Sequence, residues 1–304
     1  MKKKILLLSI ILCNCFAGIS QEKNVKPTQT VKPENVVPPY KIQPNDSIVE
    51  ITTNFGKILV RLYNETPLHR DNFLKLVRTK YFDSLMFHRV IKEFMIQGGD
   101  PDSKRAKPEQ MLGNGGPGYT IPAEINTKYF HKKGALSAAR LGDDINPKKE
   151  SSGSQFYIVH GRTFTENDLK TTEEGMNMQV KRSLYNQFLN QPENINLKNK
   201  IIQYQKENKI DSLNLINGAA INYVEEEFKK QTGFKFSDEQ LKAYSTSGGA
   251  PHLDGGYTVF GEVIEGLDII DIIANVEKVS SDRPKTDVRM YMTIPTKKEL
   301  KKRK

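Results

Sequence analysis

The chain has 304 residues, which is enough to bury a core of domain size, and its formal net charge at pH 7 is +10. Three of these charges lie in Lys2–Lys4 and a net five lie in the last eight residues, so the rest of the chain is near +2 and nucleic-acid binding is not expected. Both cysteines, Cys13 and Cys15, lie close to the N-terminus, which excludes disulfides and cysteine metal sites from the body of the chain.

Residues 1–20 have the features of a signal peptide: a basic start, a short apolar run and small residues before Gln21. The run is too short for a permanent membrane span. We therefore expect cleavage after Ser20 and a periplasmic or secreted protein without an integral membrane span.

A lipoprotein anchored through Cys15 is the alternative localisation. Leu12 stands three residues before this cysteine, as lipoprotein signals require, whereas Asn14 occupies a position where a small residue is expected. The sequence leaves both readings open.

Residues 21–46 contain five prolines and no apolar periodicity, so they are expected to form an extended linker. Alternation of apolar and polar residues begins at Ser47, and it predicts a hairpin with its turn at Phe55-Gly56. A short amphipathic helix is then expected over Thr66–Val77, with Pro67 in its first turn.

Short predicted strands follow, separated by turns rich in Gly and Pro, and this texture favours a closed barrel or a sandwich. They cover residues 86–90, 94–97, 134–139 and 155–159. Between 164 and 249 apolar residues recur at helical spacing, for example Val180, Leu184 and Phe188.

The β texture returns after Gly249, with a helix expected over Gly266–Ile273 and a last strand near 288–294. The order predicts a β domain of residues 47–163 and 250–296 that is interrupted by a helical insert, 164–249. Residues 297–304 are expected to form a solvated basic tail.

The segment Phe87–Asp100 carries the strongest indication of a functional site. At a strand period of two, Arg89 is expected on the same face as Phe87 and Ile91. A guanidinium is always charged and carries five donors, so a place among apolar side chains is costly unless a partner or ligand binds it.

Four ordered motifs resemble the cyclophilin family of peptidyl-prolyl cis-trans isomerases: Phe87–Asp100, Gly118–Glu124, Ser152–Ile158 and Leu253–Gly261. The resemblance implies a mainly β fold, a closed eight-stranded antiparallel barrel capped by two helices, into which the all-α block is inserted. It also implies rotamase activity on proline-containing polypeptides, with no cofactor and no metal.

Residue by residue, the resemblance makes Arg89 the catalytic arginine. It places Phe94, Met95 and Gln97 in the substrate site together with Ala139, Gln155, Tyr157, His252, Leu253 and Tyr257. Three positions depart from the common family residues: His252 stands for Trp or Phe, Tyr257 for His, and Arg140 for Asn. The first departure implies weaker binding of cyclosporin-type inhibitors.

The five histidines show no metal-ligand spacing, so His88 is expected to be structural and His252 to form a pocket wall. A prolyl isomerase that assists the folding of exported polypeptides, as a monomer, is the preferred function. The alternative is a chaperone or partner-binding module that uses the helical insert with little catalysis. The two ends of the insert are expected to meet close to the pocket wall.

Overall fold

The computed structural model describes residues 40–108, 110–231, 233–279 and 281–302. The predictions for the leader, with Cys13 and Cys15, and for most of the linker fall outside these residues. Two compact units are present. One contains Lys170–Phe236, and the other contains the described residues up to Leu169 and from Ser237 onward. Each is described by itself.

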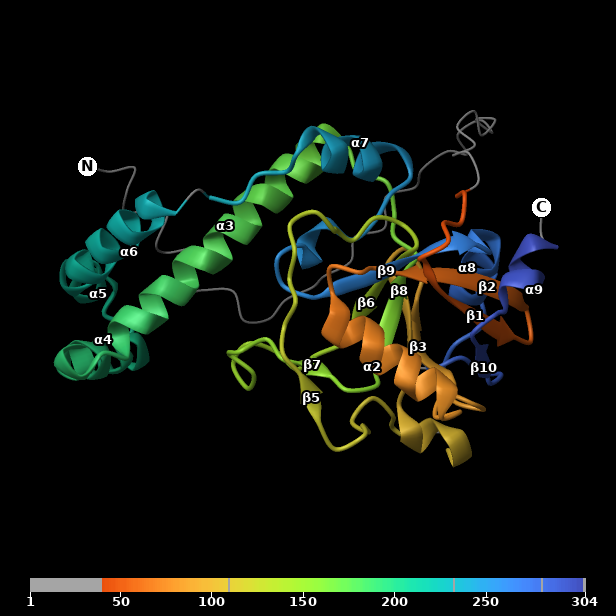
Figure 1. The fold of residues 1–304 in the computed structure, drawn as a ribbon. Helices are drawn as coiled ribbons and strands as arrows, with labels where there is room; N and C mark the ends of the chain where they lie inside the picture. The colour runs from red at the N-terminus through yellow and green to blue at the C-terminus, as the bar shows by residue number, and fades with distance from the viewer. Residues whose placement is uncertain (1–39, 109, 232, 280, 303–304) are drawn as a thin grey trace, which may run out of the picture. The chain divides into compact units, whose positions relative to one another are not determined.

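The second unit is built on an eight-stranded sheet in which every strand pair is antiparallel (Figure 1). The strand order is β10-β1-β2-β9-β6-β8-β4-β3. The bounds are β1 Ser47–Thr53, β2 Gly56–Leu62, β3 Phe87–Ile91, β4 Met95–Gly98, β6 Ala135–Ala138, β8 Phe156–Val159, β9 Val259–Glu265 and β10 Met290–Thr293. Met86 and Arg289 bridge the two outer edges, and Phe87 N–H donates to Val288 O across the same seam. The predicted eight-stranded antiparallel barrel is confirmed.

Two helices complete the barrel core. Helix α2, Pro67–Arg78, contributes Phe73 and Val77, and α8, Leu267–Ala274, contributes Ile270 and Ile273 to the same hydrophobic cluster as the inward-facing strand residues. The predicted capping by two helices is therefore confirmed. A small sheet of β5, Thr120–Ile121, and β7, Ser151–Ser152, and the 3-10 turns η1, Pro101–Arg105, and η3, Pro251–Leu253, lie in the connections.

Alternate residues of the strands belong to two different clusters. Ile96 and Ile158 join the barrel core, whereas Met95 and Tyr157 join a second cluster on the opposite face of β4 and β8. This division follows from the strand period of two. The second cluster forms the base of the pocket described below.

The predicted facing of Arg89 is partly wrong. The register of β3 against β4 shifts between Phe87 and Arg89, so His88 is an extra residue in the strand. Phe87 and Val90 consequently both enter the barrel core, while Arg89 points to the other face with Ile91. The hairpin turn also lies one residue earlier than predicted, at Asn54-Phe55, because Thr53 pairs with Gly56.

The other unit is helical and has its own apolar cluster. Its helices are α3 Glu166–Leu189, α4 Ile195–Lys206, α5 Ile210–Ile216 and α6 Gly218–Lys230, with the 3-10 turn η2 Pro192–Asn194. The cluster includes Leu184 and Leu189 of α3, Ile201 of α4 and Val224 of α6. The division between the units falls within α3, after Leu169.

Helix α7, Asp238–Thr246, belongs to the barrel unit although the sequence assigns it to the insert. Its first turn is closed by a capping box between Ser237 and Gln240. The segment before α3 and the segment after α7 run side by side, because Arg162 and Gly249 form an antiparallel bridge. The domain limits drawn from the sequence stay predictions.

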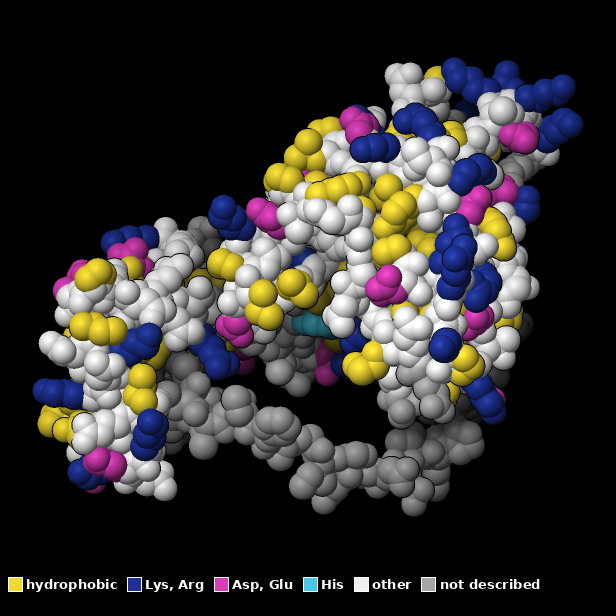
Figure 2. All heavy atoms as spheres, turned by 90° about the horizontal axis from the view of Figure 1, so that it is seen from below, with side chains coloured by type: hydrophobic (Ala, Val, Ile, Leu, Met, Phe, Trp, Pro, Cys, Tyr) yellow, Lys and Arg dark blue, Asp and Glu magenta, His cyan; other side chains and the backbone are white. Residues whose placement is uncertain are grey.

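Within the predicted basic tail, Lys297–Lys301 forms the short helix α9, with a capping box between Thr296 and Glu299 and no buried residue. On the face drawn in Figure 2, Lys and Arg side chains are spread over the surface and Asp and Glu side chains lie among them. Among the described residues, no helix has both the length and the apolar character needed to cross a membrane.

Candidate active site

A pocket of about 140 Å³ opens on the face of β3, β4 and β8 that is opposite to the barrel core. An engineered cavity of about 150 Å³ holds benzene, so this volume suits a single small ring. Eight of the ten predicted site residues line it together with Arg140: Arg89, Phe94, Met95, Gln97, Ala139, Tyr157, Leu253 and Tyr257. Gln155 and His252 do not line it.

Strand pairing places the polar and the apolar parts of the site in register. Arg89 is paired with Gln97 across β3 and β4, and Gln97 is paired with Tyr157 across β4 and β8. Directly paired residues share a face, so these three side chains form a row across three strands. This alignment depends on the extra residue His88. Without the bulge, Arg89 would lie on the same face as Phe87 and would point into the barrel core.

Arg89 has an exposed side chain whose orientation is supported by a chain of amides. Its Nη1 donates a hydrogen bond to Gln97 Oε1 at 3.3 Å, and Gln97 Nε2 donates to Gln155 Oε1 at 3.1 Å. Gln155 Nε2 in turn donates to the carbonyls of Gly113 and Gly115 at 2.9 and 2.7 Å. Gln155 therefore holds Gln97 in place from outside the pocket. The sequence predicts Gln155 in the pocket wall instead.

The loop that contains Gly113 and Gly115 holds Gln155, and a buried carboxylate fixes this loop. No role for this carboxylate was predicted from the sequence. Asp100 is fully buried and accepts the backbone N–H groups of Asp102, Gly113 and Gly115. A carboxylate that follows a strand and precedes a proline is a usable signal for a role in holding the backbone of a turn. Arg89 forms no ion pair with a carboxylate of the described residues.

The base of the pocket is apolar. Met95 and Tyr157 are buried, and Phe94 and Leu253 are partly exposed above them. The exposed His252 packs against Phe94, with ring centres 5.3 Å apart, but does not itself line the pocket.

A second arginine borders the pocket, at the position where the family commonly has Asn. The Arg140 guanidinium lies 4.4 Å from the Tyr257 ring centre, and Nε donates to Gly256 O at 2.7 Å. Nη1 pairs with Asp143 at 2.6 Å. Nη1 also donates to Leu141 O at 2.8 Å. Arg140 is thus held in place by several partners, and its guanidinium lies over the Tyr257 ring.

His88 is buried and lies outside the pocket. Burial disfavours the charged imidazolium and lowers the pKa of His88 to about 4. The ring is therefore neutral at pH 7. This placement agrees with a structural residue rather than an acid or base.

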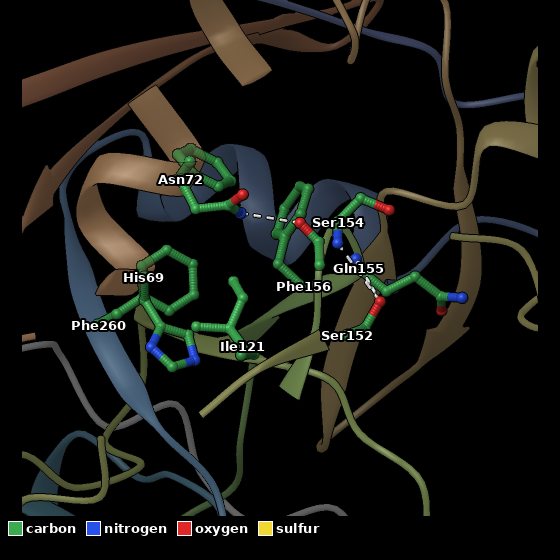
Figure 3. A pocket seen from close by; sticks show the side chains of 11 residues that line it. His69, Asn72, Ile121, Ser152, Ser154, Gln155, Phe156 and Phe260 are labelled. Carbon is green, nitrogen blue, oxygen red and sulfur yellow. Dashed lines mark hydrogen bonds between the residues drawn. The ribbon is translucent and has the colours of Figure 1, made fainter. Parts of the chain in front are cut away.

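A second, much smaller cavity has a volume of about 20 Å³, which is room for a single water. Figure 3 shows side chains that line it. His69 borders it, with Nδ1 2.6 Å from Glu124 Oε2 and Nε2 2.9 Å from Ser151 Oγ. The order Glu-His-Ser is that of hydrolytic triads, but Ser151 is only 1% exposed, so an acyl substrate cannot reach it. Glu124 also accepts the N–H groups of Leu68 and His69 at the start of α2, so the group anchors that helix.

Among the described residues, no group of three or more His, Cys, Asp or Glu side chains has an arrangement suited to a metal ion.

The chain is similar in sequence to known proteins over most of its length. Residues 48–177 and 198–294, more than half of the chain, match the family described as cyclophilin type peptidyl-prolyl cis-trans isomerase/CLD. A candidate peptidyl-prolyl cis-trans isomerase of Staphylococcus haemolyticus is 28% identical over 249 residues, which are 82% of this chain and 90% of that protein.

A candidate bifunctional phosphatase/peptidyl-prolyl cis-trans isomerase of Streptococcus pyogenes is also 28% identical, over 79% of this chain but only 37% of its own length. A crystal structure of a cyclophilin-type isomerase from Cryptosporidium parvum covers 83% of this chain and 98% of its own, with a TM-score of 0.48 and 20% identity. The match to the family over most of the barrel, together with the pocket on β3, β4 and β8, shows that the chain belongs to the cyclophilin-type peptidyl-prolyl cis-trans isomerases and catalyses the rotation of X-Pro bonds.

Proposed function

We propose that this isomerase acts on X-Pro bonds of exported polypeptides and assists their folding in the periplasm or outside the cell. The observation that carries the proposal for the site is the guanidinium of Arg89, which forms no ion pair with a described carboxylate, beside a pocket of the size of one ring with an apolar base. Export is supported by the signal-peptide pattern of residues 1–20 and the proline-rich segment that follows it.

The reaction needs a group that favours the twisted amide over both planar forms. Resonance makes the X-Pro bond partly double, and the barrier of about 20 kcal/mol leaves the uncatalysed rotation slow. When the bond twists, the proline nitrogen gains a lone pair, and a guanidinium N–H of Arg89 can donate to it. Such a bond exists only in the transition state, so it lowers the barrier without tightening substrate binding.

The apolar base supplies the rest of the catalytic environment. Met95, Tyr157 and Phe94 surround the proline ring and exclude water, which otherwise solvates the planar, polar amide. Gln97 holds Arg89 in the required orientation through its carbonyl oxygen. The rotation breaks no covalent bond, so this scheme requires neither a metal nor a cofactor.

Export and folding assistance have separate tests. The mass of the mature protein purified from a secreting host is expected to correspond to a chain that begins at Gln21, whereas a lipid-bearing mass that is lost in Cys15→Ser would establish the anchored alternative. For folding, the wild type is expected to accelerate the slow refolding phase of a secreted protein with a native cis-proline. Equal acceleration by Arg89→Ala would contradict the proposal.

A second candidate function is the binding of unfolded polypeptides by the helical unit. Its motivation is helix α5, where Ile210 and Leu215 are 65% and 83% exposed. Exposed apolar residues of this size are suited to contacts with apolar segments of a client.

In an aggregation-suppression assay, the double variant Ile210→Ser/Leu215→Ser is expected to protect less well than the wild type. Met111→Ser is the matched control, since Met111 is equally exposed, at 84%, but lies in the barrel unit. Equal protection by all three proteins would reject client binding by α5.

A further inference from the structure

Asp254, the residue after the pocket residue Leu253, is a buried carboxylate with four hydrogen-bond donors. Oδ1 accepts from the backbone N–H of His131 at 2.9 Å and lies 2.8 Å from its ring Nδ1. Oδ2 accepts from Gln240 Nε2 at 2.9 Å and from the Tyr244 hydroxyl at 2.6 Å. Several donors are needed because a buried charge is costly when its lone pairs are left unsatisfied.

The same group fixes the tautomer of His131. An ionised carboxylate only accepts hydrogen bonds, so His131 Nδ1 carries the proton and Nε2 is left as an acceptor. The hydroxyl of Tyr157 lies 2.9 Å from that Nε2, to which it can donate when His131 has this tautomer. The two rings are parallel within 12°. The base of the pocket is thus tied through His131 to Asp254.

Two of the four donors come from helix α7, which lies outside the pocket. Tyr244 is fully buried and packs edge-on against Phe130, with ring centres 5.6 Å apart. Gln240 uses both ends of its amide, since Oε1 accepts from the N–H of Ser237 while Nε2 reaches Asp254. The capping box of α7 and the bond to Asp254 therefore share one side chain.

The backbone that connects α7 to η3 is tightly packed against its neighbours. A Cβ atom on Gly249 would lie 2.3 Å from His131 O and 2.5 Å from the Tyr244 ring, so the chain between α7 and η3 passes directly against both residues. Ala250 N–H also donates to His131 O at 2.8 Å. Through Asp254 and this segment, α7 holds the turn η3 that presents Leu253 to the pocket.

We propose that helix α7 is a positioning element of the proline pocket, in which Gln240 and Tyr244 act through Asp254 and His131 to fix Tyr157 and Leu253. The proposal rests on the isomerase activity of the pocket and adds residues that do not touch the substrate. A pocket that must hold one ring tolerates only small displacements of its walls, and supporting hydrogen bonds set that precision. The Tyr157 hydroxyl, absent where the family has Phe, is the group through which this support reaches the base.

The test compares two tyrosine hydroxyl deletions in isomerase kinetics with a proline peptide. Tyr244→Phe is expected to raise KM about fivefold while kcat stays within about twofold, because displaced walls weaken binding of the planar and twisted forms alike. Tyr185→Phe is the matched control and is expected to leave both constants unchanged. Tyr185 is also buried and donates to Asn217 at 2.7 Å, but it belongs to the helical unit.

A merely structural role of Tyr244 gives a different result, because a smaller folded fraction lowers the apparent kcat and leaves KM unchanged. The double variant Tyr157→Phe/Tyr244→Phe separates the routes further. If Tyr244 acts partly through the Tyr157 hydroxyl, the substitution Tyr244→Phe raises KM less in the Tyr157→Phe protein than in the wild type. Additive effects of the two deletions would overturn this route.

The tautomer gives a spectroscopic readout that does not depend on activity. In ¹⁵N-histidine NMR spectra, His131 is expected to be protonated at Nδ1 in the wild type and to lose this preference in Asp254→Asn. An Nε2-protonated His131 in the wild type would overturn the proposed chain. An inactive wild type would contradict the site itself, whereas an active wild type with an unchanged KM in Tyr244→Phe contradicts only the role of α7.

Discussion

Arg89 and Gln97 are paired across β3 and β4, and the guanidinium donates to the amide oxygen at 3.3 Å. This pairing exists because an extra residue, His88, shifts the register and turns Arg89 away from the barrel core. The catalytic proposal therefore depends on a local irregularity of one strand.

The first prediction concerns Gln97. Gln97→Ala removes the acceptor that orients Arg89, and we expect kcat/KM to fall about tenfold, a loss of about 1.4 kcal/mol of transition-state stabilisation. Gln203→Ala is the matched control, because Gln203 is an exposed glutamine in α4 that donates to Glu207. Exchange NMR on a proline peptide measures both variants. Identical rates in the two would remove Gln97 from the mechanism.

The second prediction concerns the loop behind Gln155. In Asp100→Ala the N–H groups of Gly113 and Gly115 lose a buried acceptor, so the free energy of unfolding should fall by about 2 kcal/mol. We also expect lower kcat/KM, because the two carbonyls that hold Gln155 are no longer fixed. Urea unfolding and peptide kinetics test the two effects separately. Full stability with full activity would show that Asp100 does not organise this loop.

The third prediction is a loss of stability in acid that originates at His88. Burial lowers the pKa of His88 to about 4, whereas an unfolded histidine has a pKa of about 6.5. Below the unfolded value, the unfolded chain binds a proton that the folded chain does not. His88 therefore lowers the free energy of unfolding as the pH falls from about 6.5 to about 4, by about 3 kcal/mol in total.

The measurement is urea unfolding of the wild type and His88→Leu at pH 7 and pH 4.5. The variant should lose less stability than the wild type between these two values. His252→Leu is the control, since its ring is exposed and the effect of burial is smaller. Equal losses in the wild type and His88→Leu would mean that His88 titrates normally in the folded protein.

Much of the barrel could be predicted from the sequence because apolar alternation and Gly or Pro turns mark its strands directly. The resemblance to one family predicted ten site residues, and eight of them line one pocket. The facing of Phe87 could not be predicted, because a one-residue bulge leaves no mark in a pattern of period two.

The roles of Asp254 and His131 were missed for a different reason. Their contacts join residues that lie far apart in the chain, such as His131 and Asp254, and a lone buried polar residue gives no signal in sequence. Helix α7 shows the same limit, since its helical pattern is clear but its place beside the barrel depends on tertiary contacts of Gln240 and Tyr244.

The central claim is that Arg89 stabilises the twisted X-Pro bond. Exchange NMR on a proline peptide, with wild type, Arg89→Ala and the exposed control Arg182→Ala, tests it most directly. We expect Arg89→Ala to lower kcat about a hundredfold or more, with KM within about threefold, as for the loss of a donor that acts only in the transition state. A kcat of Arg89→Ala equal to that of Arg182→Ala would contradict the account.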